Sequence, residues 1–409
     1  MLTSDQKIKI NEMVQGFKEA ADFYRMEYSQ DLMGMFREFG CMLLEACGIN
    51  AEDDPEIKKL FGYRQVLRGT VKRQLTVIAE ELAGLWKAPV SGEMFQTALS
   101  GIFDFCLYSK GGKNRYLLPV EIAKPLLGLV TRPEGMLSPG EGETVLDTQC
   151  GAGSTLMTAC KYLKNPKLMG YELDEELWAA GIIISRLSEF KMELHLQEEI
   201  PASLYETCDL VISNPVYGTD TIKDDSLAEE LPSELRTVRG RYHLELIRGM
   251  LALKYDGKAM LIVPNSFLFA NRTESIKVRK WLLQSYSLEA VIALPEDTFL
   301  YSGVRSSVMI FSKPFMSSGW EGHTQRVLYY SLEKQEDKEK QKQEYERLEE
   351  VWSQRDSYYG KWERCRREKT VENRNGIKVP ANWQYNSFWF AGAAGIEAAK
   401  WNLLPENYR

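Results

Sequence analysis

Histidine is scarce in this sequence, and its cysteines show no paired spacing. Three histidines occur in 409 residues, and the seven cysteines lie at positions 41, 47, 106, 150, 160, 208 and 365. Because zinc sites usually need close pairs of Cys or His ligands, we expect no metal site. An odd number of unpaired cysteines favours free thiols, as in proteins of a reducing cytoplasm.

Long apolar runs and an excess of positive charge are also missing. No stretch approaches the roughly 20 apolar residues of a membrane span, and the first residues lack the apolar segment of a signal peptide. We therefore expect a cytoplasmic protein without a membrane anchor. The formal net charge is −7, whereas a protein that grips a long stretch of DNA alone is usually basic. A local basic surface or a partner would have to supply such contacts.

The stretch 209–218 carries the first chemical signal. Its apolar run 210–212 is typical of a buried parallel strand, and the following Pro215 requires the chain to turn. The turn places the amide of Asn214, the carbonyl of Pro215 and the ring of Tyr217 at the carboxyl end of a strand, where open α/β sheets bind ligands. Asn-Pro is also a common turn signal, so this dipeptide alone is compatible with a purely structural strand end.

A glycine-containing turn at 147–153 carries the second signal. A short strand is predicted to end at Asp147, and a helix is predicted to begin near position 154. Gly151 and Gly153 let the backbone approach a ligand, and the N–H groups of a helix start point towards it. Position 156 is Leu rather than the third glycine of a dinucleotide fingerprint, which favours a nucleoside over a pyrophosphate. A lone turn of this kind is often structural.

The next predicted strand, 168–172, ends in a carboxylate, Glu172. An acid at the end of the second strand of such a unit can bind both ribose hydroxyls. The alternative is a solvated side chain, which is the usual state of a glutamate.

Three motifs together resemble those of N6-adenine DNA methyltransferases. They are, in chain order, Asp-x-x-Cys-Gly-x-Gly, Gly-x-Glu and Asn-Pro-x-Tyr. The likeness extends in particular to the modification (M) subunits of type I restriction-modification systems. It covers about residues 110–315 well and both ends loosely, and an ordered series is more specific than any one motif. The resemblance implies an α/β, Rossmann-like methyltransferase that uses S-adenosylmethionine.

The resemblance also implies a role for each matching residue. Asn214 and Pro215 would accept hydrogen bonds from the adenine amino group, which frees its lone pair for attack, and Tyr217 would stack on the flipped base. The cofactor contacts implied by the resemblance are Tyr116, Pro119, Asp147, Cys150, Gly151, Gly153, Glu172 and Asn214.

The sequence departs from the family pattern at three places. Leu118, Thr148 and Val216 stand where the family has Thr, Pro and Pro. Val216 lacks the fixed φ of proline, so the turn is less constrained there. A clear Gly-Asp for the cofactor adenine is also missing, which leaves Glu198 and Glu199 as candidates.

The two ends of the chain predict helices. Apolar residues at helical spacing favour a helical N-terminal domain over 1–108, followed by the Rossmann-like methyltransferase domain over 109–315 and a helical C-terminal extension over 316–409. Within that extension, 361–374 is the most basic stretch of the chain. This basic stretch could contact DNA phosphates or a partner protein, or it could be a solvated helix end. The arginines of 219–241 could contact phosphate or belong to a solvated loop.

These features predict methylation of adenine N6 in DNA, as the modification subunit of a restriction-modification or related defence system. The sequence shows no helix-turn-helix or zinc-finger spacing. By the resemblance, a separate specificity subunit would therefore choose the DNA site. One alternative, motivated by Val216, is a cofactor-binding but catalytically weak scaffold subunit. Another is a methyltransferase that acts on RNA adenine or protein glutamine, since the same Asn-Pro geometry suits any planar amine or amide.

Overall fold

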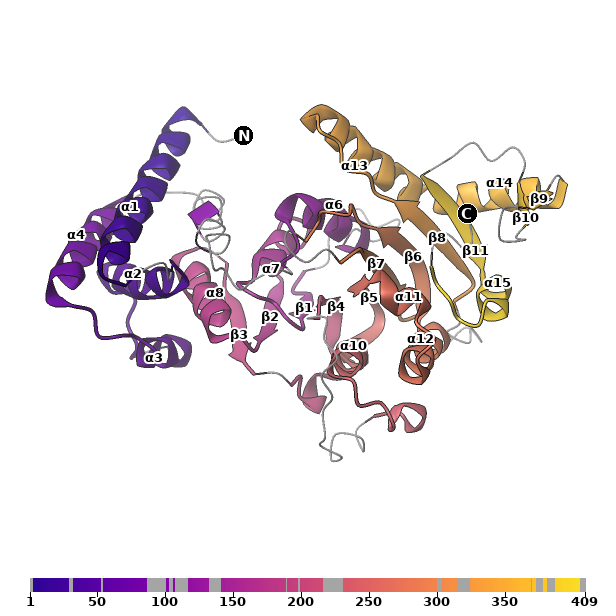
Figure 1. The fold of residues 1–409 in the computed structure, drawn as a ribbon, viewed down its shortest axis with the longest axis horizontal. Helices are drawn as coiled ribbons and strands as arrows, with labels where there is room; N and C mark the ends of the chain where they lie inside the picture. Colours follow the sequence, from indigo (N-terminus) through magenta and orange to yellow (C-terminus); the bar gives the residue numbers. More distant parts are fainter. Residues whose placement is uncertain are drawn as a thin grey trace. The chain divides into compact units, whose positions relative to one another are not determined.

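The chain divides into two compact units, which are described separately below (Figure 1). The first unit comprises residues 1–117, 150–157 and 168–198, and the second comprises 118–149, 158–167 and 199–409. The computed structural model describes residues 3–28, 32–52, 54–86, 101–102, 106, 117–131, 141–188, 190–197, 199–215, 231–299, 304–314, 324–368, 370–372, 378–380 and 387–404.

The first unit is built on the N-terminal helices α1 (Ser4–Tyr28), α2 (Leu32–Ala46), α3 (Pro55–Gly62) and α4 (Gly69–Trp86). Helices α1, α2 and α4 pack on one another, and the rings of Phe17 and Phe39 meet edge to face with centroids 4.8 Å apart. Almost all of α2 is buried because it also packs on α8 (Glu175–Leu187). The contact is close at Gly40, where a Cβ atom would lie 2.6 Å from Ile183.

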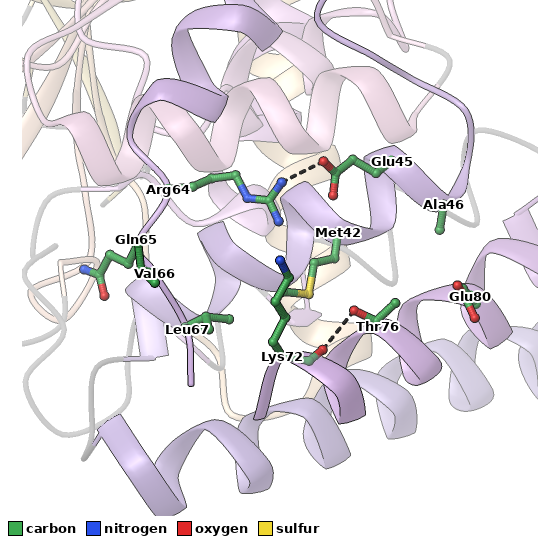
Figure 2. Close-up of a pocket in the computed structure, with 10 residues that line it drawn as sticks. All are labelled: Met42, Glu45, Ala46, Arg64, Gln65, Val66, Leu67, Lys72, Thr76 and Glu80. Carbon is green, nitrogen blue, oxygen red and sulfur yellow. Dashed lines mark hydrogen bonds and ion pairs between the residues drawn. The ribbon is translucent and has the colours of Figure 1, made fainter. Parts of the chain in front are cut away.

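The first unit also contains strands β2 (Lys167–Glu172) and β3 (Met192–Leu196), which pair in parallel. A pocket of about 530 Å³ opens between the end of α2, the connection 64–67 and α4 (Figure 2). The guanidinium of Arg64 donates to Glu45 in it at 2.7 Å. None of the predicted site residues lines this pocket.

The second unit contains a mixed sheet whose strands lie in the order β11-β8-β6-β7-β5-β4-β1. Strands β1, β4 and β5 run parallel, β7 runs antiparallel to β5 and β6, and β11 runs antiparallel to β8. Strands β4 and β7 each have an apolar centre and are almost wholly buried, as expected for strands covered on both faces. The bounds are β1 Thr144–Asp147, β4 Cys208–Ser213, β5 Leu253–Pro264, β6 Ser287–Ala293, β7 Ser306–Ser312, β8 Arg326–Ser331 and β11 Phe388–Gly392.

Helices cover this sheet. In Figure 1, α6 lies on one side of the strands, and α10 and α12 lie on the other. Helix α13 packs on α6 through its later turns, where Leu348, Val351 and Trp352 are buried, while its first turns are largely exposed. The helices are α6 Val120–Thr131, α10 Arg241–Ala252, α11 Asn265–Phe269, α12 Thr273–Ser285, α13 Lys338–Ser353, α14 Arg355–Glu368 and α15 Ala393–Ala398, with 3-10 turns η1 Ala202–Leu204 and η2 Ser233–Leu235.

The C-terminal segment thus contributes strands as well as helices. Besides α13, α14 and α15, it supplies β8 and β11 to the main sheet and a small antiparallel pair, β9 (Thr370–Glu372) with β10 (Lys378–Pro380). Within the described part of the chain, no helix combines the length and the apolar character that crossing a bilayer requires.

A buried arginine joins the C-terminal segment to α11 and α12. The side chain of Arg279 in α12 donates to the carbonyl oxygens of Phe267 at 2.6 Å, Ala270 at 2.9 Å and Trp401 at 2.8 Å. Only 1% of Arg279 is exposed. Because buried carbonyls need donors, this guanidinium holds three backbone positions that secondary structure leaves unsatisfied.

Replacing this guanidinium is expected to destabilise the protein. For Arg279→Met, loss of the donors to three carbonyls should lower the free energy of unfolding by about 3 kcal/mol, measured by urea denaturation. The matched control is Arg305→Met, which removes a 67% exposed side chain paired with Glu296 and should cost under about 1 kcal/mol. Equal losses for the two variants would contradict the structural role given to Arg279.

Candidate active site

The corner after β4 is held from both sides by backbone pairing. Ile212 pairs with Asp147 of β1, and Ser213 pairs with Leu261 of β5. Beyond β1, the backbone N–H of Thr148 donates to the carbonyl oxygen of Ile212 at 3.0 Å. Asn214 is therefore the first residue past the paired strand, at the carboxyl edge of the parallel strands.

Asn214 and Pro215 place two acceptors at this corner. The side-chain oxygen Oδ1 of Asn214 is buried, and so is Pro215. An amide oxygen and the carbonyl oxygen of a proline are both hydrogen-bond acceptors, so together they can bind an NH2 group. Tyr217, predicted to stack on the base, and Val216 lie outside the described residues.

The glycine turn after β1 begins in the second unit and continues in the first. Asp147 is 2% exposed, and its carboxylate accepts the N–H of Gln149 at 3.2 Å. In the first unit, the N–H of Cys150 donates to the carbonyl of Tyr171 at 2.9 Å. The Cys150 sulfur lies against Gly170, where a Cβ atom would come within 2.6 Å of it. Cys150 thereby anchors the turn to β2.

Both glycines of the turn are required by the backbone. Gly151 has φ +56° and Gly153 has φ +80°, a region that L-residues rarely adopt. A Cβ atom at Gly153 would also lie 2.7 Å from the side chain of Met192. Helix α7 (Ser154–Ala159) begins directly after the turn, as the sequence predicts. The two glycines therefore add no side chain to the turn, and the side chains of Leu117 and Met192 lie against them.

Glu172 fastens the same turn from the end of β2. Its Oε2 accepts the N–H of Gly151 at 2.9 Å, and its Oε1 accepts those of Leu173 at 2.8 Å and Asp174 at 2.7 Å. Burial raises the pKa of this carboxyl above its ordinary value, and the three N–H groups partly offset that effect. A carboxylate offers about four acceptor positions, so one on Oε2 remains for a hydroxyl. A glycine turn and an acid with a spare acceptor suit a nucleoside.

Other predicted residues have local partners. Pro119 directly precedes α6, and its carbonyl accepts the N–H groups of Ile122 and Ala123. The carboxylate of Glu199, a candidate for the cofactor adenine, lies 3.4 Å from Arg248 of α10. Tyr116 and Glu198 lie outside the described residues.

Near the start of α10, the structure brings together polar residues that the sequence analysis did not identify. Glu274 accepts the backbone N–H groups of Arg239 at 2.9 Å and Gly240 at 3.2 Å, and so caps the start of α10. His243, one turn into α10, shares a hydrogen bond of 3.0 Å with Ser275. These residues come from two segments about 30 positions apart, so spacing could not have paired them.

Comparison with known proteins gives a family and a fold. A sequence model of the family described as N-6 DNA Methylase matches residues 101–376, more than half of the chain. A type I restriction enzyme EcoEI methylase subunit from Escherichia coli is 22% identical over 284 residues, which cover 63% of this chain and 54% of that protein. The chain spans about half the length of the curated relatives that it matches first.

Solved structures agree with the fold. A type I restriction-modification methyltransferase subunit from Streptococcus thermophilus superposes with a TM-score of 0.68 at 17% identity, over 98% of this chain and 99% of that one. A putative class I S-adenosylmethionine-dependent methyltransferase from Listeria monocytogenes gives 0.64 at 19% identity, over 84% and 98%. The predicted fold class is confirmed: a mixed α/β methyltransferase fold with helices at both ends.

The largely buried side chain of His243 predicts a pH-dependent stability. Burial lowers its pKa below the ordinary 6.5, more than Glu274 raises it, and Arg279 and Arg272 lower it further. The folded protein therefore resists protonation. This residue's contribution is fully present above pH 6.5 and is lost as pH falls from that value through the folded pKa.

We expect His243→Gln to flatten that dependence. The free energy of unfolding of the wild type should fall more steeply than that of the variant between pH 7 and pH 5, measured by denaturant titration at each pH. His195→Gln removes a partly exposed imidazole on β3 and is the control. Parallel curves for wild type and His243→Gln would contradict the burial effect.

Proposed function

Because the chain belongs to the N-6 DNA Methylase family, we propose that it transfers a methyl group from S-adenosylmethionine to N6 of adenine in DNA. It would do so as the modification subunit of a restriction-modification or related defence system. The observation that supports this most directly is the corner at Asn214 and Pro215, which lies just past a strand paired on both edges.

For this reaction the protein needs to supply two hydrogen-bond acceptors for the amino group and to hold that group in a fixed position. The lone pair of an aromatic amine is delocalised into its ring, which makes the nitrogen a poor nucleophile. Hydrogen bonds from the NH2 group to the oxygens of Asn214 and Pro215 draw that nitrogen towards tetrahedral geometry and localise the lone pair. Tyr217 would stack on a base turned out of the duplex.

The cofactor would be held by the turn and the strand end that share Glu172. The backbone at Gly151 and Gly153, which carries no side chain of its own, would contact the cofactor closely, and the spare acceptor of Glu172 would take a ribose hydroxyl. The proposed set is completed by Asp147, Cys150, Tyr116, Pro119 and Asn214. When bound, S-adenosylmethionine supplies a methyl group activated by its sulfonium.

We further propose that a separate specificity subunit selects the DNA site. The EcoEI relative is itself a methylase subunit of a type I enzyme. The net charge of −7 also argues that the chain does not hold a long DNA footprint alone.

The test of the proposed chemistry is Asn214→Ala. Loss of one of two acceptors should reduce transfer of labelled methyl groups to DNA adenine by about 100-fold. Asn265→Ala is the matched control. Asn265 follows β5 at the same edge, but its Oδ1 already accepts the hydroxyl of Ser307 at 2.8 Å, so its loss should matter less.

The assay is run with this chain, with the proteins encoded by neighbouring genes added, and with DNA, RNA and protein as acceptors. Label that enters RNA or protein instead of DNA would replace the proposed substrate. Full activity of Asn214→Ala on DNA would remove the role given to that amide.

A second test concerns cofactor binding in the absence of any acceptor. Glu172→Ala removes the spare hydroxyl acceptor and unfastens Gly151, so the dissociation constant for S-adenosylmethionine should rise at least about tenfold. Isothermal calorimetry below the melting point of the variant measures it. Glu193→Ala on β3, which removes a half-exposed carboxylate, is the control. Unchanged affinity in Glu172→Ala would show that the cofactor binds elsewhere.

A further inference from the structure

Two hydroxyl groups meet inside the corner that carries Asn214. The Oγ1 of Thr148 donates to the Oγ of Ser213 at 2.8 Å. Thr148 is 4% exposed and Ser213 is 0% exposed, and the strand residues beside them, Asp147 and Ile212, are also buried. Both residues belong to the second unit. A buried pair of hydroxyls is costly to break, since each hydroxyl would lose its partner where water cannot replace it.

Helix α10 presses on the same pair. A Cβ atom at Gly249 would lie 3.0 Å from the methyl group of Thr148 and 3.9 Å from the Cβ of Ser213. The threonine thus uses both branches of its side chain: the hydroxyl bonds to Ser213, and the methyl group faces α10. Its backbone N–H adds a third contact, to the carbonyl of Ile212 at 3.0 Å.

This arrangement fixes the residue that directly precedes the two proposed acceptors. Strand pairing fixes the backbone of Ser213, but the paired register ends there. From that point, the direction of Asn214 depends on how firmly the Ser213 side chain and the following peptide are held. A displacement of about 1 Å in a reacting group can cost about 100-fold in rate.

We propose that Thr148 is a positioning residue, whose hydroxyl holds Ser213 so that the Asn214 amide faces the target amine. This inference rests on the proposed function, and it adds a residue that touches neither the cofactor nor the amine. Thr148 acts through Ser213 and the geometry of the corner.

The kinetic test is Thr148→Val, which keeps the shape of the side chain and removes the hydroxyl. The kcat for DNA methylation should fall about tenfold, while the KM for S-adenosylmethionine stays within about twofold. Thr148→Ser keeps the hydroxyl and should restore most of the kcat. The matched control is Thr131→Val in α6, which removes another buried threonine hydroxyl, bonded to the carbonyl of Leu127 at 2.6 Å, and should leave kcat unchanged.

A spectroscopic test does not depend on activity. The full chain is labelled with 15N-asparagine, and the side-chain amide signal of Asn214 is assigned from its absence in Asn214→Ala. In Thr148→Val this signal should shift or broaden, and in Thr131→Val it should stay in place. Thermal melting of each variant shows that the proteins compared are folded.

The outcomes separate the two proposals. An unchanged Asn214 signal in Thr148→Val, or an unchanged kcat in an active enzyme, overturns the positioning role. A wild type that methylates no DNA with its partner subunits overturns the proposed function instead, and the spectra still decide whether Thr148 orients Asn214.

Discussion

Backbone pairing on both edges of β4 is the constraint on which the candidate site depends. β1 holds one edge and β5 the other, and the register runs up to Ser213. The chain must then leave the sheet because Pro215 has no N–H to donate. Two acceptor oxygens thus stand at a strand end whose position the rest of the second unit determines.

In the first unit, a single carboxylate holds the glycine turn in place. Three backbone N–H groups converge on Glu172, one of them from Gly151. Because the turn is already ordered in this way, a ligand would not have to order it on binding, which favours affinity. Under the proposed function, this side chain would both order the turn and bind the cofactor, so its replacement would alter both stability and affinity.

The sequence predicted the parts of the site that local patterns encode. Apolar runs before Asp147, Glu172 and Asn214 marked three strand ends. The structure ends β1 at Asp147 and β2 at Glu172, and Asn214 directly follows β4. The glycines gave the turn because positive φ angles select glycine. Such signals lie within a few neighbouring residues, which is why sequence patterns are sufficient to find them.

The sequence did not predict contacts between residues that are far apart in the chain. Thr148 and Ser213 are 65 positions apart, and Glu274 caps a helix that begins more than 30 positions earlier. Nothing in the sequence near Arg279 indicates that it holds the carbonyl of Trp401. Strands β8 and β11 escaped prediction in the C-terminal segment, because a strand at the outer side of a sheet is defined by its neighbour more than by its own residues.

The contact between α2 and α8 limits how this protein can be truncated. Gly40 sits so close to Ile183 that the two helices share one apolar layer, and the rest of α2 is buried with it. A truncated protein that starts after the N-terminal helices would expose the Ile183 face of α8 to solvent. Exposed strips of this kind drive aggregation, so α8 needs the leading helices as its cover.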